Sequence, residues 1–162
     1  MMKRFKFAVT ITFSLAFTSL VAQVSRSGSD YDFPSRCLGV ELDGSSTIEC
    51  YGKGRNYLDA SEQAKKKAVY DVVFYGIKEG NGGCNANPLV FAPSAQEIYS
   101  DFISNFFKDG GKYAAYVSLS DERISNKVNR SAKKGQQAQQ RLVVVRVDRE
   151  GLKKYLSEND IK

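Results

Sequence analysis

The sequence predicts an α+β domain in which three helices pack on one face of a mainly antiparallel, four-stranded sheet, in the order ββααββα. Two short strand-like runs near the N-terminus are joined by Asp43-Gly44-Ser45-Ser46, a sequence typical of hairpin turns. A row of alanines at helical spacing follows them, and the run LVVVRV near the C-terminus is the most strand-like in the chain. Because few signals for parallel crossovers occur, we expect most strand pairs to be antiparallel.

Composition limits the function more than it defines it. The chain has 162 residues, of which 42% are hydrophobic and 12% aromatic, and these values suit one ordered domain. It contains no His, so catalytic His dyads and triads, His ligation of metals and a His-based pH switch are excluded. No paired carboxylates stand out as an acid and base couple. We therefore expect a protein that is not an enzyme and that needs no metal and no cofactor.

Residues 1–22 have the pattern of a secretory signal peptide. The segment begins with Lys3, Arg4 and Lys6, continues with an apolar run, and ends at the small residue Ala22. The apolar run is shorter than the ~20 residues that a membrane-spanning helix needs. We expect cleavage before Gln23, a periplasmic or secreted mature protein, and no transmembrane segment after cleavage. Half of the formal charge of +6 then belongs to the signal.

The mature chain divides into a polar, Ser- and Gly-rich leader at 23–35, expected to be flexible, and one α+β domain at 36–162. The domain opens with the predicted strands Cys37–Leu42 and Thr47–Tyr51. A helix is then expected at about 57–77. Its apolar row suggests close packing against a sheet, and the row consists of Ala60, Ala64, Ala68 and Val72. The run 65–67, three lysines, is expected to be a solvated face of this helix.

The second half of the domain is expected to contain a helix, two strands and a last helix. Residues 79–93 are turn-rich, and Ser94 starts a capping box, which predicts it as the N-cap of the second helix. That helix should face the core with Ile98, Phe102, Ile103, Phe106 and Phe107. Strands are then predicted at Tyr113–Leu119 and Leu142–Val147, and Asp148 can cap the last helix.

Three cysteines in an exported chain allow one disulfide and leave one thiol. A two-residue hairpin turn would place Cys37 opposite Cys50, where a cross-strand disulfide could close. A turn longer by one residue would instead place Leu38 opposite Cys50 on one apolar face, and a buried face fixes register more strongly. The sequence therefore favours a Cys37–Cys84 disulfide with Cys50 as a small buried residue, and the Cys37–Cys50 pairing stays open as the alternative.

Gly52 and Gly54 lie between a strand and a helix, which invites comparison with a phosphate-binding loop. The third glycine of that motif is absent, because its position is Tyr57. A plain turn between the strand and the helix is the favoured interpretation.

The segment Arg123–Arg141 departs from the mixed-charge surface expected elsewhere, because it is basic and contains no acid. Its position between two strands predicts a long hairpin arm, and a solvated loop without function is the favoured interpretation. The functional alternative is an arm that docks on an acidic partner or on an anionic polymer surface. The candidate partner-binding residues are Arg123, Lys127, Arg130, Lys133, Lys134 and Arg141.

The sequence from Asp43 through the predicted first helix resembles small exported proteins of Bacteroides-type bacteria, as do Asn87-Pro88-Leu89 and Phe106-Phe107-Lys108-Asp109-Gly110. More distantly, a strand that ends in Gly-x-Gly before an Ala-rich helix, from Thr47 to about Val73, resembles the N-terminal domain of flagellar assembly protein T and related cell-envelope lipoproteins. The resemblance implies an α+β accessory domain that works through protein contacts with a cell-envelope partner. The lipid-bearing cysteine of those lipoproteins has no counterpart here, and the resemblance supplies no catalytic residue.

Together these observations favour an exported, non-enzymatic accessory protein of the cell envelope that acts through protein–protein contacts. The alternative is a protein that binds an anionic polymer, glycan or nucleic acid, through the basic arm.

Overall fold

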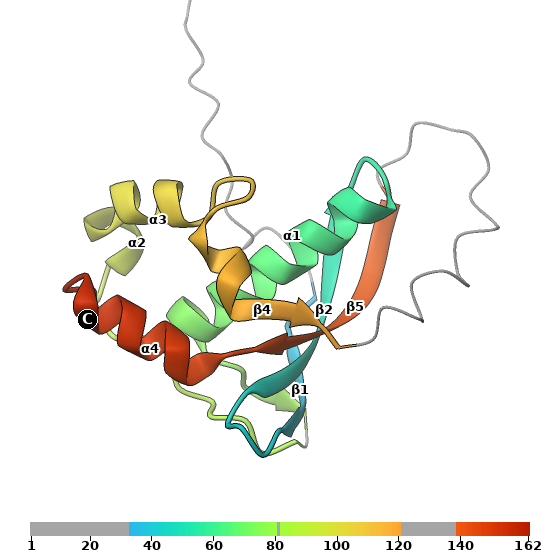
Figure 1. Ribbon diagram of the computed structural model, residues 1–162, viewed down its shortest axis with the longest axis horizontal. Helices are drawn as coiled ribbons and strands as arrows, with labels where there is room; N and C mark the ends of the chain where they lie inside the picture. The colour runs from blue at the N-terminus through green and yellow to red at the C-terminus, as the bar shows by residue number, and fades with distance from the viewer. Residues whose placement is uncertain (1–32, 81, 121–138) are drawn as a thin grey trace, which may run out of the picture.

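The computed structural model describes residues 33–80, 82–120 and 139–162 (Figure 1). The predicted signal at 1–22, most of the leader and five of the six candidate arm residues lie outside these ranges. In the described part of the chain, helices pack on one mixed sheet of five strands, so the α+β class is confirmed. The last residues of the predicted leader contact the domain, since the Ser35 hydroxyl donates to the buried Asp71 carboxylate at 2.5 Å.

The sheet has the strand order β3-β1-β2-β5-β4. Its strands are β1 (Arg36–Val40), β2 (Ser46–Gly54), β3 (Glu79–Gly80), β4 (Val117–Leu119) and β5 (Gln139–Val147). The prediction of four antiparallel strands was wrong in detail, because β3 adds a short fifth strand parallel to β1. Gly80 makes this possible: a Cβ on it would lie 2.1 Å from the Cys37 carbonyl oxygen, and its φ of +100° favours glycine.

The pairing of β1 with β2 differs from both expected registers. Cys37 lies opposite Ile48 and Val40 opposite Ser46, with a bulge between Cys37 and Gly39. The bulge adds one residue to β1, so Leu38 and Val40 are each half-exposed while Cys37 faces the core. The expected apolar face of Leu38 with Cys50 does not form.

Helix α1 (Tyr57–Tyr70) lies across β2 and β5, as the alanine row predicted (Figure 1). Ala60, Ala64 and Ala68 are fully buried. A Cβ on Gly52 would lie 1.9 Å from the Ala60 carbonyl oxygen, so this close approach requires glycine. The space beside Gly52 and Gly54 is filled by the α1 backbone, and the glycines pack a helix rather than cradle a phosphate.

The first helix does not continue to Ile77, because α1 passes into a π-helix, η1 (Asp71–Tyr75). This change of hydrogen-bonding leaves the Val72 and Val73 carbonyl groups available to the turn-rich loop. Leu89 and Val90 donate to the Val73 carbonyl through their backbone N–H groups at 3.0 and 2.9 Å. The wide helical turn therefore anchors one end of the loop.

The predicted Cys37–Cys84 disulfide is present, with Cα atoms 5.8 Å apart, and it anchors the other end of this loop to β1. Cys50 is a free, buried cysteine, as expected.

The expected second helix is two short ones, α2 (Ala95–Ile98) and α3 (Ser100–Phe106). Ser94 is the N-cap residue of α2, as predicted, but the capping box does not form: Ser94 has φ +57° and its side chain makes no capping hydrogen bond. A 3₁₀-helix η2 (Lys112–Tyr116) replaces most of the strand expected from Tyr113. Asp148 does cap α4 (Arg149–Glu158), accepting from the Gly151 N–H at 2.8 Å.

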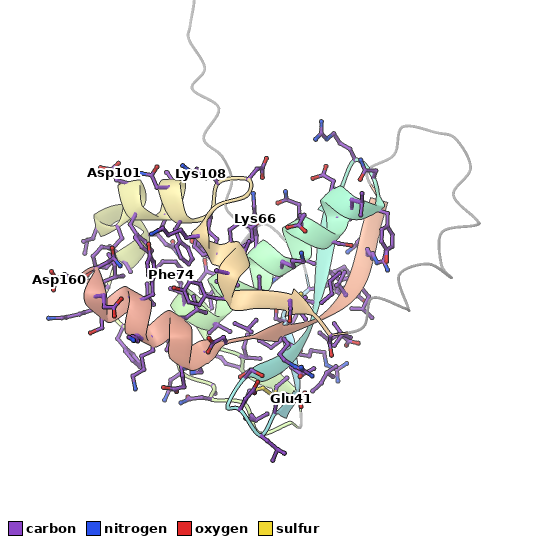
Figure 2. All side chains as sticks on the ribbon, in the orientation of Figure 1. Glu41, Lys66, Phe74, Asp101, Lys108 and Asp160 are labelled. Atoms are coloured by element: carbon purple, nitrogen blue, oxygen red, sulfur yellow. A yellow bond between two sulfur atoms is a disulfide. The ribbon has the colours of Figure 1, made fainter. Side chains whose placement is uncertain are left out.

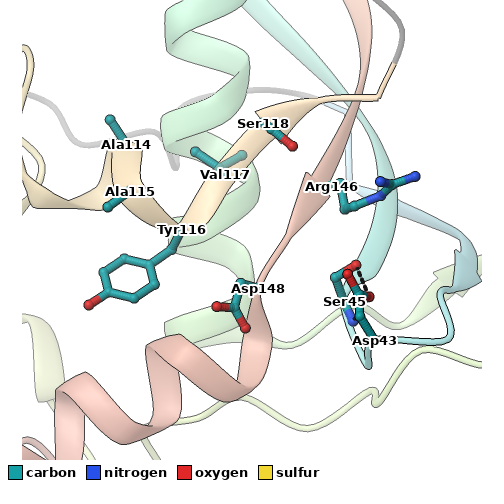
Figure 3. A pocket seen from close by; sticks show the side chains of 9 residues that line it. All are labelled: Asp43, Ser45, Ala114, Ala115, Tyr116, Val117, Ser118, Arg146 and Asp148. Carbon is teal, nitrogen blue, oxygen red and sulfur yellow. Dashed lines mark hydrogen bonds between the residues drawn. The ribbon is translucent and has the colours of Figure 1, made fainter.

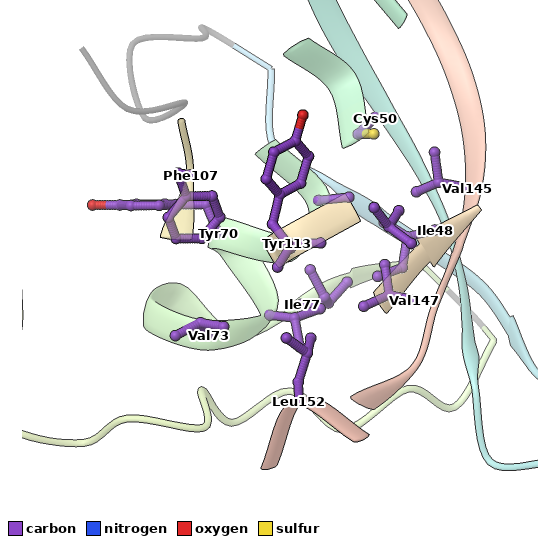
Figure 4. Close-up of a cluster of buried hydrophobic side chains, with 14 of the residues drawn as sticks. Ile48, Cys50, Tyr70, Val73, Ile77, Phe107, Tyr113, Val145, Val147 and Leu152 are labelled. Carbon is purple, nitrogen blue, oxygen red and sulfur yellow. The ribbon is translucent and has the colours of Figure 1, made fainter. Parts of the chain in front are cut away.

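The core lies between the sheet and the helices (Figure 4). Aliphatic side chains of β2 and β5, among them Ile48 and Val145, meet α1 on one side. An aromatic layer continues beyond α1, where the Phe107 ring centroid lies 5.4 Å from that of Tyr70 and 6.0 Å from that of Tyr113. The expectation that the phenylalanine cluster belongs to the core is confirmed for Phe106 and Phe107, which are both buried.

Candidate binding surface on the open face of the sheet

One face of the sheet is covered by α1, and the opposite face, called here the open face, is covered by no described helix (Figure 1). Side chains alternate along a strand, and directly paired residues share a face. The pairs that share the open face are Thr47 with Arg146, Glu49 with Val144, and Tyr51 with Leu142. The open face therefore presents a row of polar and apolar side chains from the two central strands.

The open face is apolar where β2 and β5 pair beyond the ends of β1 and β4. There Leu142 is 44% exposed, and its partner Tyr51 is half-buried. The Phe33 ring packs on Tyr51 with centroids 4.8 Å apart, and Phe33 is itself exposed. Exposed aromatic and aliphatic groups gathered on one face mark interaction surfaces more often than isolated ones do.

Charged groups lie beside this apolar patch, on the side where β1 and β4 join the sheet. Arg146 forms an ion pair with Glu41 across 3.4 Å, and the Thr47 hydroxyl donates to the same Glu41 carboxylate at 2.6 Å. Arg36 and Glu49 form a looser pair at 3.9 Å. Exposed pairs of this kind add little stability, so they are free to exchange partners with a docking surface.

A groove of about 590 Å³ continues the open face between the β1–β2 turn and β4 (Figure 3). Both carboxylates in it already accept hydrogen bonds. Asp43 accepts from the Ser45 hydroxyl at 2.6 Å and from the Ser45 N–H at 2.9 Å, and these bonds hold the pKa of Asp43 below its usual value. Asp148 caps α4. The groove can therefore accept polar groups of a partner but holds no free acid and base pair.

Arg141, the described member of the predicted basic arm, lies on the covered side of the sheet, opposite Gly52. Its guanidinium carbon lies 2.9 Å from the centroid of the Tyr57 ring, and partial burial lowers the pKa of Arg141. The structure thus gives Arg141 a packing contact with α1. The other arm candidates, which are Arg123, Lys127, Arg130, Lys133 and Lys134, lie outside the described residues.

The three lysines of α1 are not a solvated face, and that expectation was wrong. Lys67 is 4% exposed and forms an ion pair with Asp71 at 2.6 Å. Lys66 pairs with Asp109, and Lys65 pairs with Glu62 at 2.6 Å. These lysines are covered because α1 has neighbours on its flanks as well as below it.

The buried cluster of Lys67, Asp71 and Ser35 offers no exposed group to a substrate. Each of the three is at most 5% exposed, and Asp71 accepts hydrogen bonds from both of the others. Cys50 lies close to the pair, and burial raises the pKa of its thiol to about 12. A thiol with that pKa is protonated at neutral pH and is a poor nucleophile. The cluster fixes the entry of the chain into β1.

In the ranges that the structure describes, no group of His, Cys, Asp or Glu side chains could hold a metal ion. Among the described helices, none is both long and apolar enough to cross a membrane.

Sequence reasoning missed the open face. A partial signal was present, because Thr47–Lys53 alternates between polar and apolar residues, whereas Leu142–Val147 is apolar except for Arg146. The missing information was which set of alternate residues faces α1, and the Ala60–Val72 row does not specify it.

Comparison with protein families, characterised proteins and solved structures finds no match to this chain.

Proposed function

We propose that the protein is an exported accessory protein of the cell envelope, and that it binds another exported protein through the open face. The observation that carries this proposal is the exposure of Leu142 beside Tyr51 and Phe33, on the part of the sheet where β2 and β5 pair beyond the ends of β1 and β4. Exposed apolar groups gathered on one face mark interaction surfaces. An apolar patch with charged groups beside it has the organisation of a transient protein interface.

The Cys37–Cys84 disulfide supports the proposal that the protein is exported. Disulfides persist in oxidising compartments and are rare where thiol reductants act. The signal pattern at 1–22 makes the same prediction from the sequence. N-terminal sequencing of the protein recovered outside the cytoplasm should begin at Gln23, and a chain that begins at Met1 there would contradict export.

Site-specific photocrosslinking tests the docking face. A photoreactive residue at Leu142 should give one crosslinked partner, identified by mass spectrometry, in cells that express the protein. The matched control is Leu58 on α1, which is also an exposed leucine. The proposal would be overturned if the same partner were captured equally from Leu58. It would also be overturned if Tyr51→Ser left the crosslink from Leu142 unchanged.

The alternative, binding of an anionic polymer through the basic arm, can be separated by charge. Changing Arg130, Lys133 and Lys134 to Ser should not affect the Leu142 crosslink if the open face is the interface. Changing Lys78, Lys153 and Lys154 together to Ser is the matched charge control, because it also removes three positive charges and all three lysines are exposed. The lysines at 65–67 of α1 are unsuitable as a charge control, because Lys67 is buried in an ion pair and its loss would also affect stability.

A further inference from the structure

A second candidate site lies away from the sheet, between α3, the turn that follows it and α4. Figure 2 labels Lys108, which lies in that turn. The site is a pocket of about 260 Å³, called here the α3–α4 pocket. The residues that carry the argument are Phe102, Asn105, Phe106, Lys108, Lys112 and Tyr155. This volume suits a ligand of about one six-membered ring rather than a folded partner.

Three aromatic rings form the wall of the pocket. Phe106 is buried and holds the others in place: its centroid lies 5.1 Å from that of Phe102 and 5.5 Å from that of Tyr155, and both pairs are stacked. Phe102 and Tyr155 are only partly buried, and their centroids are 6.3 Å apart. The rings therefore offer a fixed apolar surface, so a ligand that packs on it need not order the wall.

The rim of the pocket is positive. Lys108 and Lys112 are both exposed, and the Lys112 ammonium lies 5.3 Å from the centroid of the Tyr155 ring. A cation in that position is attracted to the ring and is directed toward the wall. No Asp or Glu lines the pocket, and Asp109 in the turn is engaged by Lys66. The Asn105 side chain adds a polar group that can hydrogen-bond to hydroxyls.

We propose that the α3–α4 pocket binds a carboxylate-bearing sugar ring, namely a uronic acid unit of an acidic glycan. The apolar C–H face of the sugar packs on Phe102 and Tyr155. The carboxylate forms charge-assisted hydrogen bonds with the ammonium groups of Lys108 and Lys112. The sugar hydroxyls reach Asn105 and solvent. This site is separate from the open face and from the basic arm, so it does not depend on the proposed protein contact.

Protein-observed NMR titration of the mature chain with glucuronate tests the proposal. We expect amide shifts confined to residues 102–112 and the part of α4 around Tyr155, with a Kd on the order of 1 mM for the single sugar. Glucose, which lacks the carboxylate, should bind at least about tenfold more weakly, because it forms no charge-assisted bond. Benzoate, which lacks the hydroxyls, should also bind more weakly than glucuronate.

Paired lysine variants provide the decisive control. Lys108→Gln with Lys112→Gln should weaken glucuronate binding about tenfold or more, whereas Lys153→Gln with Lys154→Gln removes the same charge from α4 and should leave it unchanged. Equal weakening by both variants would reduce the effect to general charge and overturn the proposal. Tighter binding of benzoate would overturn the choice of a sugar, and so would shifts centred elsewhere or no shift at ~20 mM glucuronate.

Discussion

The covered face and the open face of the sheet use alternate residues of the same strands, yet they have opposite characters. On β5, Val145 and Val147 are fully buried beneath α1, whereas Leu142 and Arg146 remain exposed on the other side. On β2, Ile48 and Cys50 are fully buried, and Tyr51 is only half-buried. The residues on the covered face therefore specify the fold, because they form the core with α1. The alternate residues on the open face are not needed for that core, so they can contact a partner.

The largest effect should follow loss of the bond that joins the covered face to the turn-rich loop. Changing Cys37 and Cys84 together to Ser should lower the free energy of unfolding by about 4 kcal/mol, because the disulfide closes a long loop in the unfolded chain. Urea unfolding of the variant, and of the reduced parent, measures this. A loss below ~1 kcal/mol in both would mean that the Leu89 and Val90 backbone contacts anchor the loop alone.

The next effect concerns the approach of α1 to the covered face. Gly52→Ala should cost about 3 kcal/mol, because the new Cβ would lie 1.9 Å from the Ala60 carbonyl oxygen and the helix must move. Gly39→Ala on β1 is the matched control, since a Cβ there has no atom within 4 Å, and it should change stability by less than ~0.5 kcal/mol. Thermal unfolding of both variants gives the comparison, and equal losses would show that α1 packs less closely.

A single substitution at two neighbouring valines compares the faces directly. Val145→Thr places a hydroxyl in the fully buried layer and should cost about 2 kcal/mol, whereas Val144→Thr on the open face should cost less than ~0.5 kcal/mol. Both variants replace a valine of β5 by threonine, so the two positions differ only in the surroundings of the side chain. Denaturant unfolding that ranks Val144→Thr as the more damaging change would mean that the two faces have been assigned the wrong way round.

The sequence predicted those parts of the fold that depend on local periodicity or on composition. The alanine row of α1 packs on the sheet and Asp148 caps α4, and each of these signals lies in the spacing or type of a few residues. The Cys37–Cys84 pairing is also confirmed, although the register from which it was argued does not form.

Other features depended on contacts between distant segments and could not be read locally. The short β3 depends on the approach of Gly80 to Cys37, more than forty residues away in the chain, and the bulge in β1 appears only where β1 pairs with β2. Ser94 adopts a left-handed conformation that no capping motif predicts. The same limit applies to the candidate sites, since the open face and the α3–α4 pocket exist only once β2 meets β5 and Phe106 meets Tyr155.

Cys50 offers the smallest and most specific test of the covered face. Burial raises the pKa of this thiol to about 12, well above the ~8.5 of an exposed cysteine. Between those two values the unfolded chain loses the thiol proton while the folded chain keeps it, so unfolding becomes more favourable as the pH rises.

The effect is absent below about pH 8.5 and grows by about 1.4 kcal/mol for each pH unit above it. At pH 9.5 the parent should therefore have lost about 1.4 kcal/mol that Cys50→Ala does not lose, each variant being compared with itself at pH 7.5. The comparison ends at pH 9.5 because burial also raises the pKa of Tyr113, whose unfolded form begins to ionise near pH 10. Iodoacetamide provides the parallel readout, since the folded thiol should stay unmodified at pH 9.5 and react once urea unfolds the chain. Rapid alkylation without urea, or an identical pH dependence in Cys50→Ala, would show that solvent reaches the layer between β2 and α1.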